Sequence, residues 1–160
     1  MKKIIFSLIF TLICGLGYPQ KSIIIGDSQS NYIALNSKEA TLYLPLYKVG
    51  IGLSGLNKLV TKNTVKAETK FVFISIGVND NYKYLNIGFE KNLKRVFPNA
   101  KFYLVQGSYG WGNAKHFNYN YYKNFNFSII SPGIGYGDPH KNKESYRLIG
   151  KKIDYIIKNE

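Results

Sequence analysis

With 160 residues, the chain is long enough for one domain with a hydrophobic core and too short for two. Hydrophobic residues make up 45% of it and charged residues only 19%, which argues against intrinsic disorder. Its 22 Lys and Arg against 9 Asp and Glu give a net charge of +13, which attracts polyanions. The lysines are scattered, however, and no zinc-finger or RNA-binding motif occurs, so no specific nucleic-acid partner is expected.

Residues 1–17 have the order of a bacterial secretory signal. A positive start at residues 1–3 precedes an almost wholly apolar run over 4–16, and Gly15 and Gly17 are small residues at the positions that a signal peptidase reads. Because the apolar run is short for a membrane-spanning helix, we expect cleavage after Gly17 and export, with no stable membrane insertion afterwards. An uncleaved anchor or a buried N-terminal helix is the alternative.

The single cysteine, Cys14, lies inside this leader. Lipid attachment at Cys14 is not expected, because the residue before such a cysteine is normally small and Ile13 is not. The mature protein would then contain no thiol, disulfide or Cys-based metal site. Only two histidines occur, and the spacing of the carboxylates matches no known metal-binding loop, so we expect neither a metal nor another cofactor.

The remainder, residues 18–160, is predicted to be one domain of alternating strands and helices. An apolar, β-branched run at 22–25 that ends at a glycine is typical of a strand buried on both faces of a parallel sheet. Further strands are expected at 42–49, 71–76, 101–105 and 127–130. Apolar residues at helical spacing indicate helices near 56–60, 89–97 and 146–156. This alternation predicts a three-layer α/β fold with a flavodoxin-like, five-stranded parallel sheet.

Polar residues and glycines follow several of these strands. Loops at the carboxyl ends of parallel strands meet in one crevice, where ligands bind. Ser28 follows the first strand directly, and Asn79 follows the third, where a side-chain amide can donate to a developing oxyanion. A glycine of segment 50–55, which opens the helix after the second strand, offers a backbone N–H as another donor. Asp27, next to Ser28, can accept from backbone amides near the start of the following helix. Taken singly, these segments are also ordinary helix caps and turns.

A histidine precedes the last expected helix. His140 lies in a glycine-rich loop together with Asp138, where a base could reach a neighbouring strand end. The other histidine, His116, is expected on the surface.

These segments together resemble the four sequence blocks of the SGNH (GDSL-like) hydrolases. The blocks at 26–28 and 77–80, the glycine-rich segment between them, and the Asp and His before the last helix occur in the family's order, each at the matching element. The resemblance covers residues 21–157 and implies the SGNH hydrolase fold and ester hydrolysis.

The resemblance also assigns roles. It makes Ser28 the nucleophile and His140 its base, while Gly55, Asn79 and the N–H of Ser28 itself stabilise the oxyanion. Gly52 is the alternative to Gly55 as the glycine donor. Asp138 would orient His140, although one residue separates them where the family usually has two. A backbone carbonyl or a water could orient the imidazole instead.

The substrate class follows partly from the resemblance and partly from the chain length. The family often hydrolyses acetyl or short acyl esters on carbohydrates, and a short chain predicts a shallow, open pocket suited to acyl groups on a polymer. Tyr109 and Trp111 are expected at the rim, where they could stack on a sugar ring, although Trp111 could equally cover the core edge. The expected partner is therefore a small-molecule or polysaccharide ester. An O-acyltransferase and a non-catalytic carbohydrate-binding module stay open as alternatives.

Overall fold

The computed structural model describes residues 21–77, 79, 88–105, 128–130 and 143–160. Its strands are β1 (Lys21–Gly26), β2 (Thr41–Tyr47), β3 (Thr69–Ser75), β4 (Lys101–Val105) and β5 (Ser128–Ile130). Its helices are α2 (Ser28–Ala34), α3 (Leu53–Thr61), α4 (Phe89–Val96) and α6 (Lys143–Asn159).

The strands form one parallel sheet in the order β2-β1-β3-β4-β5. This is the flavodoxin-like order of a doubly wound sheet, in which the chain winds outward from β1 in both directions. The β-branched residues of β1 are buried on both faces, as expected for a central parallel strand. The predicted five-stranded parallel sheet is therefore confirmed.

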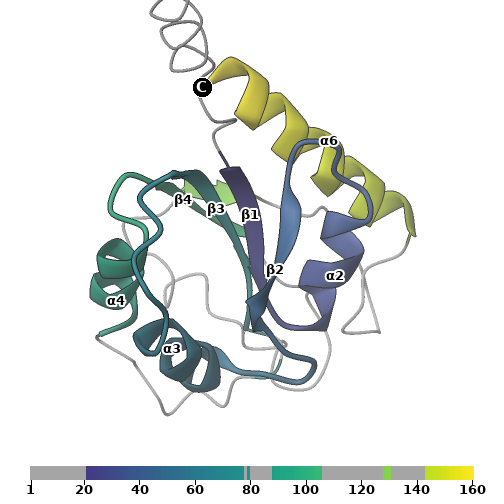
Figure 1. Ribbon diagram of the computed structural model, residues 1–160. Helices are drawn as coiled ribbons and strands as arrows, with labels where there is room; N and C mark the ends of the chain where they lie inside the picture. The colour runs from purple at the N-terminus through teal and green to yellow at the C-terminus, as the bar shows by residue number, and fades with distance from the viewer. Residues whose placement is uncertain (1–20, 78, 80–87, 106–127, 131–142) are drawn as a thin grey trace, which may run out of the picture.

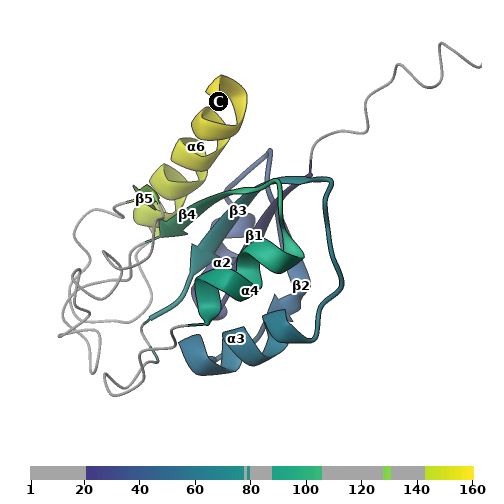
Figure 2. The ribbon, with the colours of Figure 1, turned by 90° about the vertical axis from the view of Figure 1, so that its left-hand side faces the viewer.

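Helices cover both faces of the sheet (Figure 1). On one face, α3 and α4 pack side by side over alternate residues of β1 and β3, among them Ile23 and Val72 (Figure 2). On the other face, α2 and α6 pack over the intervening residues, such as Ile24 and Phe73. Neighbouring residues of a strand point to opposite faces, so one apolar run supplies both cores. The predicted three-layer architecture is confirmed.

Two elements differ from the sequence-based expectation. Strand β2 ends at Tyr47, earlier than the predicted end at 49, and most of its residues are partly or fully exposed. It is an edge strand that contains Pro45, a residue that edge positions tolerate because it cannot donate to the ladder. Helix α2 has only seven residues, and its buried side chains include the polar residues Gln29 and Ser30. It therefore lacks the apolar residues at helical spacing from which the other helices are predicted.

Within the part of the chain that the structure describes, no helix has the length and apolar character needed to cross a membrane. In the same residues, His, Cys, Asp and Glu side chains nowhere gather in a group of three that could hold a metal ion.

Candidate active site

The turn after β1 lies directly against the end of β3. Gly26 has φ +130°, and a Cβ added there would lie 1.8 Å from the carbonyl oxygen of Ser75, so only glycine fits. The next amide, that of Asp27, donates to the same Ser75 oxygen at 3.0 Å. This close approach lets the chain leave the sheet in one residue and begin α2 at once.

Asp27 is the N-cap of α2. It is 1% exposed, and its Oδ1 accepts from the backbone N–H of Gln29 at 3.0 Å. A carboxylate at this position satisfies an amide of the first turn and interacts favourably with the positive end of the helix. One turn in, the hydroxyl of Ser30 donates to the Ile25 carbonyl at 2.9 Å and so ties α2 back to β1. The sequence prediction that Asp27 caps a helix is confirmed.

Ser28 is the first residue of α2 and is partly exposed. Its backbone N–H belongs to the first helical turn, whose amides point out of the N-terminal end of a helix. The predicted nucleophile therefore lies at the carboxyl end of the interior strand β1, on a turn held by Gly26, Asp27 and Ser30.

Asn79 connects this turn to two other strand ends. It lies just beyond the end of β3 and is exposed, and its side-chain Nδ2 is 3.5 Å from Oδ2 of Asp27 and 3.3 Å from the carbonyl oxygen of Ile51. Ile51 belongs to the segment between β2 and α3, and nearby the Lys48 amide donates to the Gly26 carbonyl at 3.1 Å. The ends of β1 and β3 and the segment after β2 thus meet around the Asn79 amide.

The two candidate glycines lie at different places in α3. Gly52 is its N-cap, and Gly55 lies in its first turn, where a Cβ would come 2.7 Å from Cγ1 of Ile51. The contact from Asn79 reaches Ile51, whose carbonyl carbon is bonded to the nitrogen of Gly52. The structure therefore brings the 51–52 peptide beside Asn79 and gives Gly55 a packing role; the donor role of Gly55 stays a prediction.

Several predicted residues lie outside the described part of the chain, namely His140, Asp138, Trp111 and Tyr109. The helix that follows His140 in sequence is described from Lys143 onward. Close to its start, Tyr146 stacks on Tyr32 of α2 with ring centroids 5.2 Å apart. The helix that begins with Ser28 and the helix that follows the predicted base are therefore packed together.

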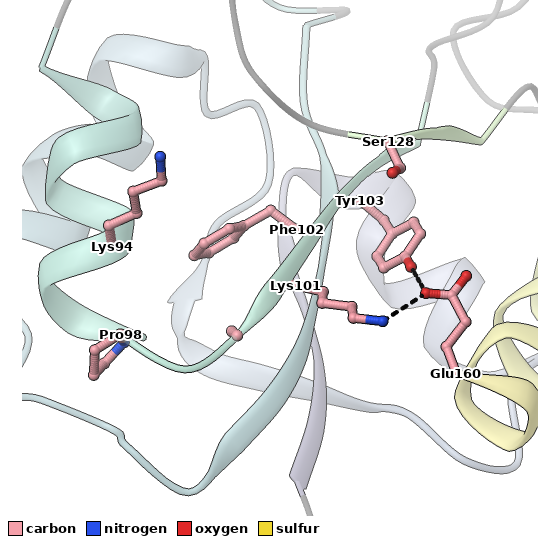
Figure 3. Close-up of a pocket in the computed structure, with 8 residues that line it drawn as sticks. Lys94, Pro98, Lys101, Phe102, Tyr103, Ser128 and Glu160 are labelled. Carbon is pink, nitrogen blue, oxygen red and sulfur yellow. Dashed lines mark hydrogen bonds and ion pairs between the residues drawn. The ribbon is translucent and has the colours of Figure 1, made fainter.

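A pocket of about 560 Å³ lies away from this edge (Figure 3). It surrounds the amino half of β4, where Lys101 begins the strand, and includes Phe102, Tyr103 and the C-terminal residue Glu160. Tyr103 and Lys101 both donate to the Glu160 carboxylate. This pocket is at the amino end of the strands, opposite the end that carries Ser28, so it is not part of the candidate site.

The sequence indicates only a capping role for Asp27 and no role for Ile51. The contact of Asn79 with both residues depends on the order of the strands in the sheet, which no local sequence pattern indicates. The one sequence feature that points to Asp27 is its position next to the predicted nucleophile, Ser28.

Comparison by structure identifies the architecture. No protein-family model and no curated protein matches the sequence. Among solved structures, a member of the lipolytic protein G-D-S-L family from Veillonella parvula DSM 2008 is similar, with a TM-score of 0.57 and 13% sequence identity. The match covers 88% of this chain and 99% of that one. The chain has the SGNH hydrolase fold.

Two further solved structures resemble this SGNH hydrolase fold at lower TM-scores. An extracellular lipase from Streptomyces rimosus has a TM-score of 0.48 and 12% identity, covering 83% of this chain and 99% of the lipase. A two-domain esterase active on acetylated mannans, co-crystallised with mannopentaose, has a TM-score of 0.47 and 16% identity, covering 88% of this chain and 50% of the esterase.

Proposed function

We propose that this protein is a serine esterase that passes an acyl group from an ester first to Ser28 and then to water. One observation supports it above the others. The Asn79 amide nitrogen lies within 3.5 Å of the Asp27 carboxylate, and Asp27 is the residue next to Ser28. The Ser28 hydroxyl and the Asn79 amide, which follow two different strands, therefore share the carboxyl edge of the sheet, where such folds bind ligands.

In the proposed reaction, His140 takes the proton of the Ser28 hydroxyl as Oγ attacks the ester carbonyl carbon. The carbonyl oxygen becomes an oxyanion that accepts from Nδ2 of Asn79, from the N–H of Ser28 and from an amide at the start of α3, with Gly55 or Gly52 as its source. When the carbon–oxygen bond to the alcohol breaks, His140 returns the proton to the leaving alkoxide. A water then releases the acyl group by the same steps, and Asp138 orients the imidazole.

The proposed substrate is a short acyl ester on a carbohydrate, reached after export directed by residues 1–17. Cleavage after Gly17 removes Lys2 and Lys3, and the resulting net charge of +11 favours an anionic polysaccharide over a neutral one. Tyr109 and Trp111 are proposed to stack on the sugar at the rim of the site.

Labelling with a fluorophosphonate tests the nucleophile, because the probe forms a stable adduct only with an activated serine. We expect one adduct on Ser28 in the wild type, none in Ser28→Ala, and labelling slower by on the order of 10⁴-fold in His140→Ala. Ser37→Ala is the matched control, since Ser37 is a serine outside the candidate site whose hydroxyl donates to Asp154. Equal labelling of wild type and Ser28→Ala would remove Ser28 from the mechanism.

Product analysis then separates hydrolysis from acyl transfer. With a model acetyl ester and a sugar acceptor both present, the proposed esterase yields free acetate and unmodified sugar. Acetylated sugar as the main product would instead identify an acyltransferase that uses the same acyl-enzyme.

A further inference from the structure

We propose that Asp27 is a positioning residue that decides which end of the Asn79 amide faces the ends of the strands. The inference rests on the proposed function and adds a role that helix capping alone does not require. The capping bond from the Gln29 amide ends at Oδ1 of Asp27, whereas Oδ2 lies 3.5 Å from Nδ2 of Asn79.

The chemistry of the contact permits one amide orientation. An ionised carboxylate can only accept hydrogen bonds, and so can a backbone carbonyl. The Asn79 amide faces one of each, Oδ2 of Asp27 at 3.5 Å and the Ile51 oxygen at 3.3 Å. With the amide turned over, its own oxygen would lie against a carboxylate that is 1% exposed. Two acceptor oxygens would then be in contact in a buried position, which is unfavourable. The two acceptors therefore hold Nδ2, the oxyanion donor, toward the site.

The length of the two contacts leaves the donor available for catalysis. Both lie at the long end of the hydrogen-bond range, so both are weak. A developing oxyanion is a charged acceptor and forms a stronger bond than the neutral Ile51 carbonyl. During the reaction it takes over the N–H that faces Ile51, while Asp27 keeps the other. The gain occurs in the transition state and not in the bound substrate, so loss of Asp27 reduces kcat and leaves KM nearly unchanged.

Asp27→Asn separates positioning from capping. Asn caps a helix as well as Asp does, so the substituted side chain keeps the Gln29 bond through its oxygen. Its other end is then an NH₂ group, which faces Asn79 as a donor where the carboxylate was an acceptor. The Asn79 amide then faces a donor at position 27 and an acceptor, the Ile51 oxygen, so Nδ2 loses one of the two contacts that hold it toward the site.

The experiment measures kcat and KM for p-nitrophenyl acetate, together with the melting temperature, for the wild type, Asp27→Asn, Asn79→Ala and the double variant. For Asp27→Asn we expect kcat to fall about 100-fold, as after loss of one oxyanion donor, with little change in KM or in melting temperature. The double variant is expected to lose no more than either single variant, because both substitutions remove the same donor. A wild-type kcat in Asp27→Asn, or losses that multiply in the double variant, would overturn the inference.

Two further variants make the outcomes distinguishable. Asp154→Asn is the matched control, because Asp154 also accepts from backbone amides, those of Lys38 at 3.0 Å and Glu39 at 3.1 Å, and we expect it to keep wild-type kcat. An equal loss of kcat in Asp154→Asn would overturn the positioning role. Ser28→Ala reports on the proposed function itself. If wild type and Ser28→Ala turn over the ester equally, the proposed function fails and this inference falls with it.

The contact is also measurable without any substitution at Asp27, should that variant fold poorly. In NMR spectra of the wild type, with the Asn79 side-chain signals assigned from Asn79→Ala, the amide proton that faces Asp27 is expected downfield of its random-coil position. Both amide protons at random-coil positions would overturn the inference.

Discussion

The two ends of the sheet hold their polar groups in different ways. At the carboxyl end, the Asp27 carboxylate is buried and accepts from the Gln29 amide and the Asn79 side chain. At the amino end, where Figure 1 shows the C-terminus, the Glu160 side chain is 41% exposed and pairs with Lys101 at 3.2 Å. Removing a buried acceptor leaves donors without partners, whereas water replaces an exposed one. The polar contacts at the carboxyl end, where Ser28 lies, therefore constrain the structure. Water can replace those at the amino end.

The largest expected effect is at the turn before Ser28. In Gly26→Ala, the new methyl group would overlap the Ser75 carbonyl, which lies 1.8 Å from its position, so β1 and β3 would have to separate. We expect the free energy of unfolding in urea to fall by more than about 4 kcal/mol, or folding to fail. Gly50→Ala is the control: φ is also positive there, at +72°, but the added atom meets nothing within 4 Å, so the loss should be only about 1 to 2 kcal/mol. Equal losses would show that close contact at the carboxyl end is not what demands Gly26.

A smaller effect is expected where α6 approaches α2. A Cβ on Gly150 would lie 2.0 Å from the carbonyl oxygen of Asn36, in the turn that follows α2, so Gly150→Ala pushes α6 away from that turn despite the better helix propensity of alanine. We expect a loss of about 2 kcal/mol in the free energy of unfolding.

Gly55→Ala is the control for Gly150→Ala. A Cβ on Gly55 would lie 2.7 Å from the Ile51 side chain, which can rotate away, whereas the Cβ on Gly150 meets backbone atoms, so the loss of stability in Gly55→Ala should be the smaller one. A Gly150→Ala protein as stable as wild type would show that α6 can shift freely over α2.

The smallest effect is expected at the amino end. Hydrogen bonds from Tyr103 and Lys101 hold the pKa of Glu160 below its ordinary value, so any stabilisation from its charge is present above that value and is lost as the pH falls. Since Glu160 is exposed, Glu160→Gln should lower the free energy of unfolding by less than about 1 kcal/mol near neutral pH. Urea unfolding of both proteins from pH 3 to pH 10 measures the difference, and a loss as large as that of Gly26→Ala would erase the contrast between the two ends.

The strands and three of the helices could be predicted because their signals are local. A β-branched run that ends at Gly26 indicates a buried strand, and apolar residues at helical spacing indicate α3, α4 and α6. Helix α2 carries no such spacing, because Gln29 and Ser30 are buried through contacts with the strand ends and not through apolar side chains. Its range therefore could not be derived from the pattern.

The candidate site likewise has a part that follows from the sequence and a part that does not. The positions of Ser28 and Asn79 directly after two strands follow from the sequence alone, because a parallel sheet places the carboxyl ends of its strands at one edge. Which groups touch there does not follow from it. The contact of Asn79 with Asp27 and Ile51 requires β1 to lie between β2 and β3, an order that depends on packing between segments far apart in the chain. Local patterns indicate most of the strands and helices, because those signals lie within one segment, and only tertiary packing decides which strand ends meet.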